Sequence, residues 1–75
     1  MSIKIIAGAW AKRYNIAGET EVEIKSDANI ADALAGLPIK PNEIGMVSLN
    51  DKAAARETVL QEGDKLEIFP VIIDG

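Results

Sequence analysis

The sequence predicts a single α+β domain in which one helix lies across a mixed β-sheet. Its 75 residues leave room for only one domain. Residues 20–25 and 65–70 alternate apolar and polar side chains, as half-buried strands do. Residues 30–37 instead repeat apolar side chains at helical spacing. The resulting order of strand, strand, helix, strand, weak strand and strand is typical of an α+β roll with four or five strands.

The first strand is predicted over residues 2–9, which are rich in isoleucine. Alternation places Ile5 on the core face of this strand and Ile6 on the opposite face. Residues 10–19 show no alternation and are expected to form a long connection, in which Trp10 covers one end of the core. The alternative is that Trp10 and Tyr14, with Lys12 and Arg13 between them, mark a binding edge. Residues 20–25 then form an antiparallel strand that is buried on one face.

The helix is predicted to begin after Asn29, a residue type that caps helix N-termini well. Asp32 stands three residues later and can reach back to the free amides of the first turn. Gly36, followed by Leu37-Pro38, ends the helix. An isolated helix this short is marginal in water, so packing against the sheet must stabilise it.

Turns and short strands follow in order: a turn-rich link at 41–45, a strand at 46–49, a tight turn at 50–51 and a weak strand at 52–56. Val59 and Leu60 are expected to point inward from a tucked turn. The turn at 62–64 leads into the last strand at 65–70. Pro70 has no N–H to donate, so regular pairing should stop near it. If the first and last strands are neighbours, the last strand is central.

The predicted core consists of aliphatic side chains on the inward faces of these elements: Ile5, Val22, Ile24, Ile30, Leu34, Val47, Leu49, Leu60, Leu66 and Ile68.

Composition excludes several kinds of site. The chain has no cysteine and no histidine, which removes thiol nucleophiles, thiolate metal sites and the usual general base. The sequence therefore predicts no metal site and no catalytic centre of its own.

The formal net charge of −4 argues against a nucleic-acid partner, because such binding depends on neutralising phosphates. No apolar run is long enough to span a membrane, and the first residues do not resemble a signal peptide. We therefore expect a cytoplasmic protein with no membrane partner.

The last residues carry the candidate functional group. Gly75 follows a run of five apolar residues, Phe69-Pro70-Val71-Ile72-Ile73, and Asp74. Glycine has no Cβ, so its carboxylate is sterically open and its backbone fits a narrow cleft. This pattern predicts a domain over residues 1–70 and a flexible tail over 71–75.

Ile6 and Phe69 are candidates for an apolar partner-binding patch on the open side of the sheet. The alternative, that a loop covers them, is equally consistent with the sequence.

Several segments together resemble the β-grasp fold of ubiquitin-like proteins. They are Ile30 to Leu34 in the helix, Val47-Ser48-Leu49-Asn50, and Thr58 to Pro70 with its Leu-Gln-Glu-Gly-Asp turn and Phe-Pro end. With Val71 and Gly75 added, the chain is similar more narrowly to the family of the thiamine sulfur carrier and the molybdopterin synthase small subunit.

This resemblance implies a carrier and not an enzyme. An ATP-dependent activating enzyme would adenylate the Gly75 carboxylate, which would then become a thiocarboxylate. A sulfur-accepting synthase subunit would receive the sulfur, for molybdopterin, its tungsten counterpart or thiamine. ATP would be used by the partner, with no cofactor bound by the chain itself. Residues Pro70, Val71, Ile72, Ile73 and Asp74 would fit the tail into these partners.

One residue departs from the family pattern. The tails of these carriers end in two glycines, whereas this chain has Asp74 before Gly75. A β-carbon widens the tail, and its carboxylate repels an incoming nucleotide phosphate. The alternative hypothesis is therefore a β-grasp interaction module that keeps the fold without the sulfur chemistry.

Overall fold

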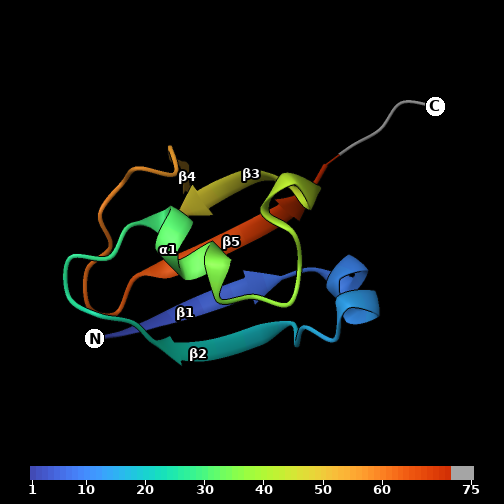
Figure 1. Ribbon diagram of the computed structural model, residues 1–75, viewed down its shortest axis with the longest axis horizontal. Helices are drawn as coiled ribbons and strands as arrows, with labels where there is room; N and C mark the ends of the chain where they lie inside the picture. Colours follow the sequence, from blue (N-terminus) through green and yellow to red (C-terminus); the bar gives the residue numbers. More distant parts are fainter. Residues whose placement is uncertain (72–75) are drawn as a thin grey trace.

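A computed structural model describes residues 1–71 of the chain. One face of a five-stranded sheet carries the short helix α1 (Figure 1). The strands are β1 (Ser2–Ala7), β2 (Glu19–Glu23), β3 (Ile44–Leu49), β4 (Lys52–Ala53) and β5 (Lys65–Pro70). The helices are α1 (Ile30–Ala35) and two 3-10 helices, η1 (Ala9–Tyr14) and η2 (Pro41–Glu43). The predicted α+β roll is confirmed.

The strand order is β2-β1-β5-β3-β4, so the C-terminal strand is central, as expected if it neighbours the first. β1 and β5 run parallel, with Ile5 opposite Leu66, and the other three pairs are antiparallel. β5 is therefore fixed on both edges, by β1 and by β3. The chain therefore leaves the sheet from its central strand.

The core lies between the sheet and α1. Its completely buried large side chains come from β1, α1 and β5: Ile3, Ile5, Ile30, Leu34, Leu66 and Ile68. Predicted core residues Val22, Ile24 and Leu49 are only half-buried and pack against this cluster from its margin. Val22 and Ile24 lie on or beside an edge strand, so one side of each lacks a neighbour.

The start of α1 forms the predicted capping arrangement. Asp32 N donates to Asn29 Oδ1 at 2.9 Å, and Asn29 N donates to Asp32 Oδ2 at 3.0 Å. Gly36 follows the last helical residue. Backbone bonds tie this segment to the chain near Leu60, since Ile30 N donates to Thr58 O and Leu60 N donates to Ala28 O. Capping and these bonds hold a helix that is too short to be stable alone.

Two predictions about the N-terminal half were wrong in their bounds. β1 ends at Ala7 and not at residue 9, because residues 9–14 form η1 within the long connection. β2 spans Glu19–Glu23 and not residues 20–25. Ala11 in η1 and Ile16 after it are buried, and they close one end of the core. Trp10 and Tyr14 pack partly buried against the core, as expected for Trp10.

Two further corrections concern the C-terminal half. β3 begins at Ile44, inside the predicted link, because the pairing of Ile44 with Pro70 extends the strand. Val59 is 57% exposed and does not point inward. An antiparallel bridge between Asn29 and Val59 extends the chain there, so neighbouring side chains alternate and only Leu60 faces the core.

Candidate functional site

The candidate site is the point where the chain leaves the sheet, at the end of β5 (Figure 1). Pro70 is the last residue of the strand and lies opposite Ile44. Val71 N donates to Glu43 O at 3.2 Å, which fixes the first residue beyond the strand. β5 ends at Pro70, near the point where the sequence predicted that regular pairing would fail, and its register with β3 is already irregular between Ile44 and Val47. The root of the tail, Pro70 and Val71, is thus attached to the end of η2.

Gly45 allows β3 to approach this root closely. A Cβ at Gly45 would lie 2.8 Å from Pro70 O and 3.2 Å from Val71 Cα, which is too close for any other residue without a shift. The register of the β3–β5 ladder also changes between Ile44 and Val47. The sequence predicts a turn-rich link over residues 41–45, whereas Gly45 lies in β3. A glycine beside an apolar strand segment is the signal for such a close approach.

Arg56 holds the same segment from the other side. Its Nη2 donates to Ile44 O at 2.6 Å and to Gly45 O at 3.0 Å. Its Nη1 donates to Pro41 O at 3.2 Å. One guanidinium therefore joins the start of η2 to the start of β3. Nothing in the local sequence indicated this role, because the partners lie 11 to 15 residues away.

A cavity of about 370 Å³ adjoins the root of the tail, lined by Arg13, Tyr14, Asn42, Glu43, Pro70 and Val71. Arg13 Nη2 donates to Tyr14 Oη at 3.2 Å, and the guanidinium lies 5.1 Å from the centre of the Tyr14 ring. Tyr14 meets Trp10 edge to face at 6.1 Å. Tyr14, packed against Trp10, thus orients the Arg13 cation beside Pro70 and Val71, and such a cation can bind a carboxylate or a phosphate.

Ile6 and Phe69 lie on the face of the sheet that α1 leaves open. Each alternates with a buried neighbour, Ile5 or Ile68, on strands that are paired with each other. Both are half-buried, and neither belongs to the residues packed against the core. Met46, 56% exposed on the adjoining strand, adds apolar surface. Ile6 and Phe69 therefore share one face of the sheet.

Ile72, Ile73, Asp74 and Gly75, which the sequence assigned to the tail, lie outside the described residues. Within residues 1–71, no three histidine, cysteine, aspartate or glutamate side chains gather closely enough to hold a metal ion. In the same part of the chain, no helix is long and apolar enough to cross a membrane.

Solved structures place this arrangement in a known class, the β-grasp fold of ubiquitin-like proteins. SAMP1 from Haloferax volcanii superposes with a TM-score of 0.80 over 100% of both chains, at 23% sequence identity. A putative molybdopterin converting factor, subunit 1, from Pyrococcus furiosus gives 0.77 over 96% of this chain and 99% of that one, at 15% identity. At such low sequence identity, these structural matches establish the fold alone.

The family follows from the sequence. The model of the ThiS family matches residues 10–73, which is most of the chain. The protein belongs to the ThiS family, within the group that the sequence resemblance indicated. Among curated proteins, none matches this sequence. The family match ends before Asp74 and Gly75.

Proposed function

We propose that this protein is a sulfur carrier whose Gly75 carboxylate is activated by a partner enzyme. A carboxylate oxygen attacks the α-phosphorus of ATP, pyrophosphate leaves, and an acyl-adenylate forms. Hydrosulfide supplied by the partner system then attacks the acyl carbon, AMP leaves, and a thiocarboxylate forms. That sulfur serves the synthesis of a cofactor, molybdopterin, its tungsten counterpart or thiamine. Membership of the ThiS family is the observation that carries this proposal.

The structure supports the proposal by showing that the root of the tail, Pro70 and Val71, is held in place on the domain. The bond from Val71 to Glu43, the close approach at Gly45 and the Arg56 guanidinium all fix the position of the root. The chain contains no cysteine or histidine. The nucleotide chemistry therefore falls to the activating enzyme, and this protein acts as its substrate.

Two surfaces beside the root are the proposed contacts for the activating enzyme and for the sulfur-accepting synthase subunit. Ile6 and Phe69 offer apolar area on the open face of the sheet. Arg13 offers an oriented cation at the cavity next to Pro70 and Val71. A partner that receives the tail would contact both surfaces, because they flank the same exit from β5.

Intact-mass spectrometry tests the proposal. The protein is incubated with a ThiS-family activating enzyme, ATP and a sulfur donor, and we expect the mass gain of one sulfur replacing one oxygen. A chain lacking Gly75 serves as the control and should gain nothing. An unchanged mass with activating enzymes from both the thiamine and the molybdopterin pathways would contradict sulfur transfer.

The partner surface is tested in the same assay. Phe69→Asp should slow thiocarboxylate formation, because it places a charge in the apolar contact. Val59→Asp is the matched control, since Val59 is exposed in the segment that bridges to Asn29. Equal rates for the two variants would show that Phe69 does not face the partner.

Asp74 favours a second candidate, a β-grasp interaction module that binds through its sheet without transferring sulfur. Removal of Gly75 separates the two functions. A carrier loses all activity in its pathway, whereas a module that binds through the sheet keeps its partner. Affinity capture of the partner by the shortened chain, together with an unchanged mass of the full chain, would establish the second function.

A further inference from the structure

The outer edge of β2 presents unpaired backbone groups. Among residues 1–71, β2 pairs only with β1. Met1 and Ile24 exchange both backbone hydrogen bonds, at 2.7 and 2.8 Å, and Ala7 N donates to Gly18 O at 2.9 Å. Hydrogen-bonded and non-bonded pairs alternate in an antiparallel ladder. Glu19, Glu21 and Glu23 therefore turn their N–H and C=O groups away from β1.

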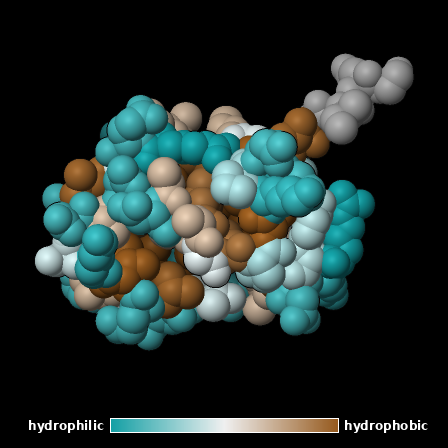
Figure 2. All heavy atoms as spheres, in the orientation of Figure 1, coloured by the Kyte–Doolittle hydropathy of each residue, from teal (hydrophilic) through white to brown (hydrophobic). Residues whose placement is uncertain are grey.

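An apolar groove runs beside this edge, between β2 and α1. Its cavity measures about 360 Å³, and its lining combines the apolar residues Val22, Ile24, Ala33 and Leu37 with the acidic residues Glu23 and Asp32. Figure 2 shows apolar surface between these two elements on the face that carries α1. Side chains of an added strand that lay opposite Val22 and Ile24 would point into this groove, because directly opposed residues share a face.

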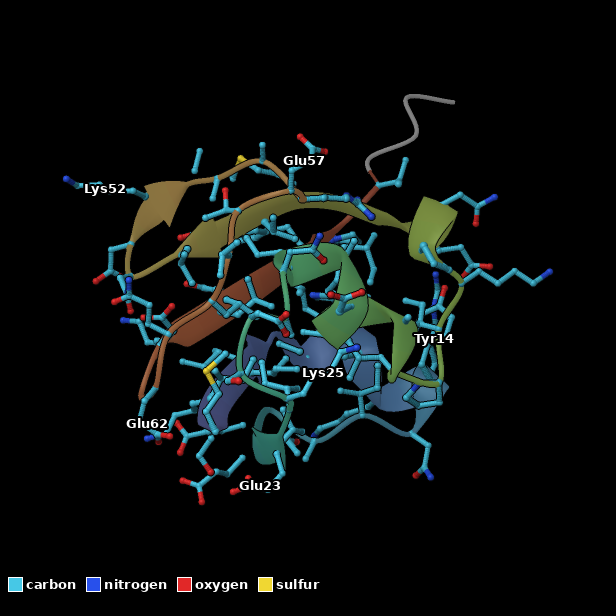
Figure 3. All side chains as sticks on the ribbon, turned by 60° about the vertical axis from the view of Figure 1, so that its left-hand side comes forward. Tyr14, Glu23, Lys25, Lys52, Glu57 and Glu62 are labelled. Atoms are coloured by element: carbon cyan, nitrogen blue, oxygen red, sulfur yellow. The ribbon has the colours of Figure 1, made fainter. Side chains whose placement is uncertain are left out.

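Acidic side chains cover the other face of the same strand. Glu19, Glu21 and Glu23 are all exposed there. Glu62 lies close to Glu23, since both accept hydrogen bonds from Ser2. Figure 3 shows Glu23 and Glu62 along the same margin of the molecule. A second copy of this chain would set glutamate against glutamate, which is unfavourable, whereas lysine or arginine would be attracted.

We propose that the β2 edge binds an extended segment of a protein partner in which apolar residues alternate with lysine or arginine. The segment pairs with the outward backbone groups of Glu19, Glu21 and Glu23. Its apolar side chains enter the groove against α1, and its basic side chains lie beside the glutamates. This interface goes beyond the carrier function. It lies at the opposite edge of the sheet from β4, and β1 separates it from β5 (Figure 1).

The probe is the peptide acetyl-Lys-Val-Lys-Ile-Lys-Val-Lys-amide, titrated into the full-length, isotope-labelled protein and followed by NMR. We expect saturable shifts in the amide signals of β2 and of Leu37, together with slower hydrogen exchange at Glu21 and Glu23. The control peptide, with glutamate at every lysine position, should bind more weakly. Saturable shifts confined to other parts of the sheet would overturn the proposal, and so would the absence of binding.

N-methylation of the peptide tests the backbone pairing directly. In an added strand, alternate N–H groups point toward β2 and the others point to solvent. Methylating one alternate set should abolish binding, while methylating the other set should leave it intact. If the peptide binds antiparallel to β2, methylating the lysine N–H groups should abolish binding. If it binds parallel, methylating the N–H groups of the apolar residues should abolish binding. Equal effects of both sets would rule out strand addition.

Charge complementarity is tested with Glu21→Lys. We expect peptide binding to weaken roughly two- to tenfold, as an exposed charge pair is reversed. Glu57→Lys is the matched control, because Glu57 is exposed far from Glu23 (Figure 3). Both variants should keep the wild-type circular dichroism spectrum. Equal weakening by both variants would show only a general charge effect.

The competing occupant of the groove is a second copy of this chain. Sedimentation velocity distinguishes a partner segment from a second copy, because only the second copy would make the protein a dimer. We expect a monomer. A dimer that Glu21→Lys strengthens or disrupts would place the β2 edge between two copies and overturn the proposal.

Discussion

Gly45 and Pro70 lie so close together that a β-carbon on Gly45 would stand 2.8 Å from the Pro70 carbonyl oxygen. This contact joins the start of β3 to the last residue of β5. The root of the proposed carrier tail is therefore positioned by a residue from another strand. Changes at Gly45 should affect both the stability of the domain and the direction in which the tail leaves it.

We expect Gly45→Ala to lower the free energy of unfolding by about 1–3 kcal/mol, the range for inserting a methyl group into a packed site. The obstructing atoms belong to the backbone, so no side chain can move aside. Urea denaturation measures the change. Gly18→Ala is the control, because its new Cβ would meet only Ala7 O at an ordinary 3.7 Å. Similar losses for both variants would argue against the close approach.

Arg56→Ala should lower the free energy of unfolding by about 1–2 kcal/mol, because three carbonyl groups lose a charged donor. Arg56→Lys should give an intermediate value, since an ammonium cannot reproduce the planar fork of a guanidinium. Thermal denaturation provides the comparison. Lys52→Ala, an exposed substitution in β4, should have almost no effect. A neutral Arg56→Ala would show that the guanidinium does not hold η2 to β3.

Asp74→Gly should accelerate activation by the partner enzyme, because it removes a negative charge and a β-carbon beside the reacting carboxylate. Lowering the activation barrier by only about 1.4 kcal/mol would raise the rate about tenfold. Pyrophosphate release measures the rate. Asp74→Asn keeps the width of the side chain without the charge, so it separates the two effects. Slower activation of both variants would instead indicate a partner channel that recognises the aspartate.

Glu23 should contribute to stability at neutral pH, and this contribution should be lost in acid. The Ser2 hydroxyl donates to its carboxylate at 2.7 Å, and this bond and the Met1 ammonium lower the pKa of Glu23 below its ordinary 4.5. A lowered pKa stabilises the folded state above pH 4.5, and this contribution disappears as the pH falls through the folded value.

Glu23→Gln keeps an acceptor for Ser2 but cannot ionise. We therefore expect the stability difference between wild type and Glu23→Gln to shrink as the pH falls from 7 to about 3, the range in which carboxylates titrate. Added salt should reduce the difference at neutral pH, because Glu23 is exposed and its charge is screened. Urea denaturation measures it, with Glu57→Gln as the control. A difference that is constant with pH would contradict this account.

The elements that the sequence predicted well are those whose signals are local. Alternation over residues 65–70 matches the bounds of β5, and the Asn29–Asp32 pair forms the expected cap. Asn50 and Asp51 both have positive φ angles, as their predicted tight turn requires. These features depend on neighbouring residues, so a short window of sequence contains all the necessary information.

Features that depend on distant residues were missed. The exposure of Val59 follows from its bridge to Asn29, 30 residues earlier. The functions of Gly45 and Arg56 depend on where β3, β5 and η2 meet. The cavity beside the tail combines Arg13 with Val71, from opposite ends of the chain. No window of sequence contains both members of such a contact.

By itself, then, the sequence determined the fold class and the order of the elements, because periodicity and capping are properties of adjacent residues. Its resemblance to the sulfur-carrier family indicated the residue proposed to carry sulfur. Only the tertiary structure decided how the root of the tail is held and which strand edge remains open for a partner. Those features arise when separate strands are brought into register, because packing between distant segments sets them.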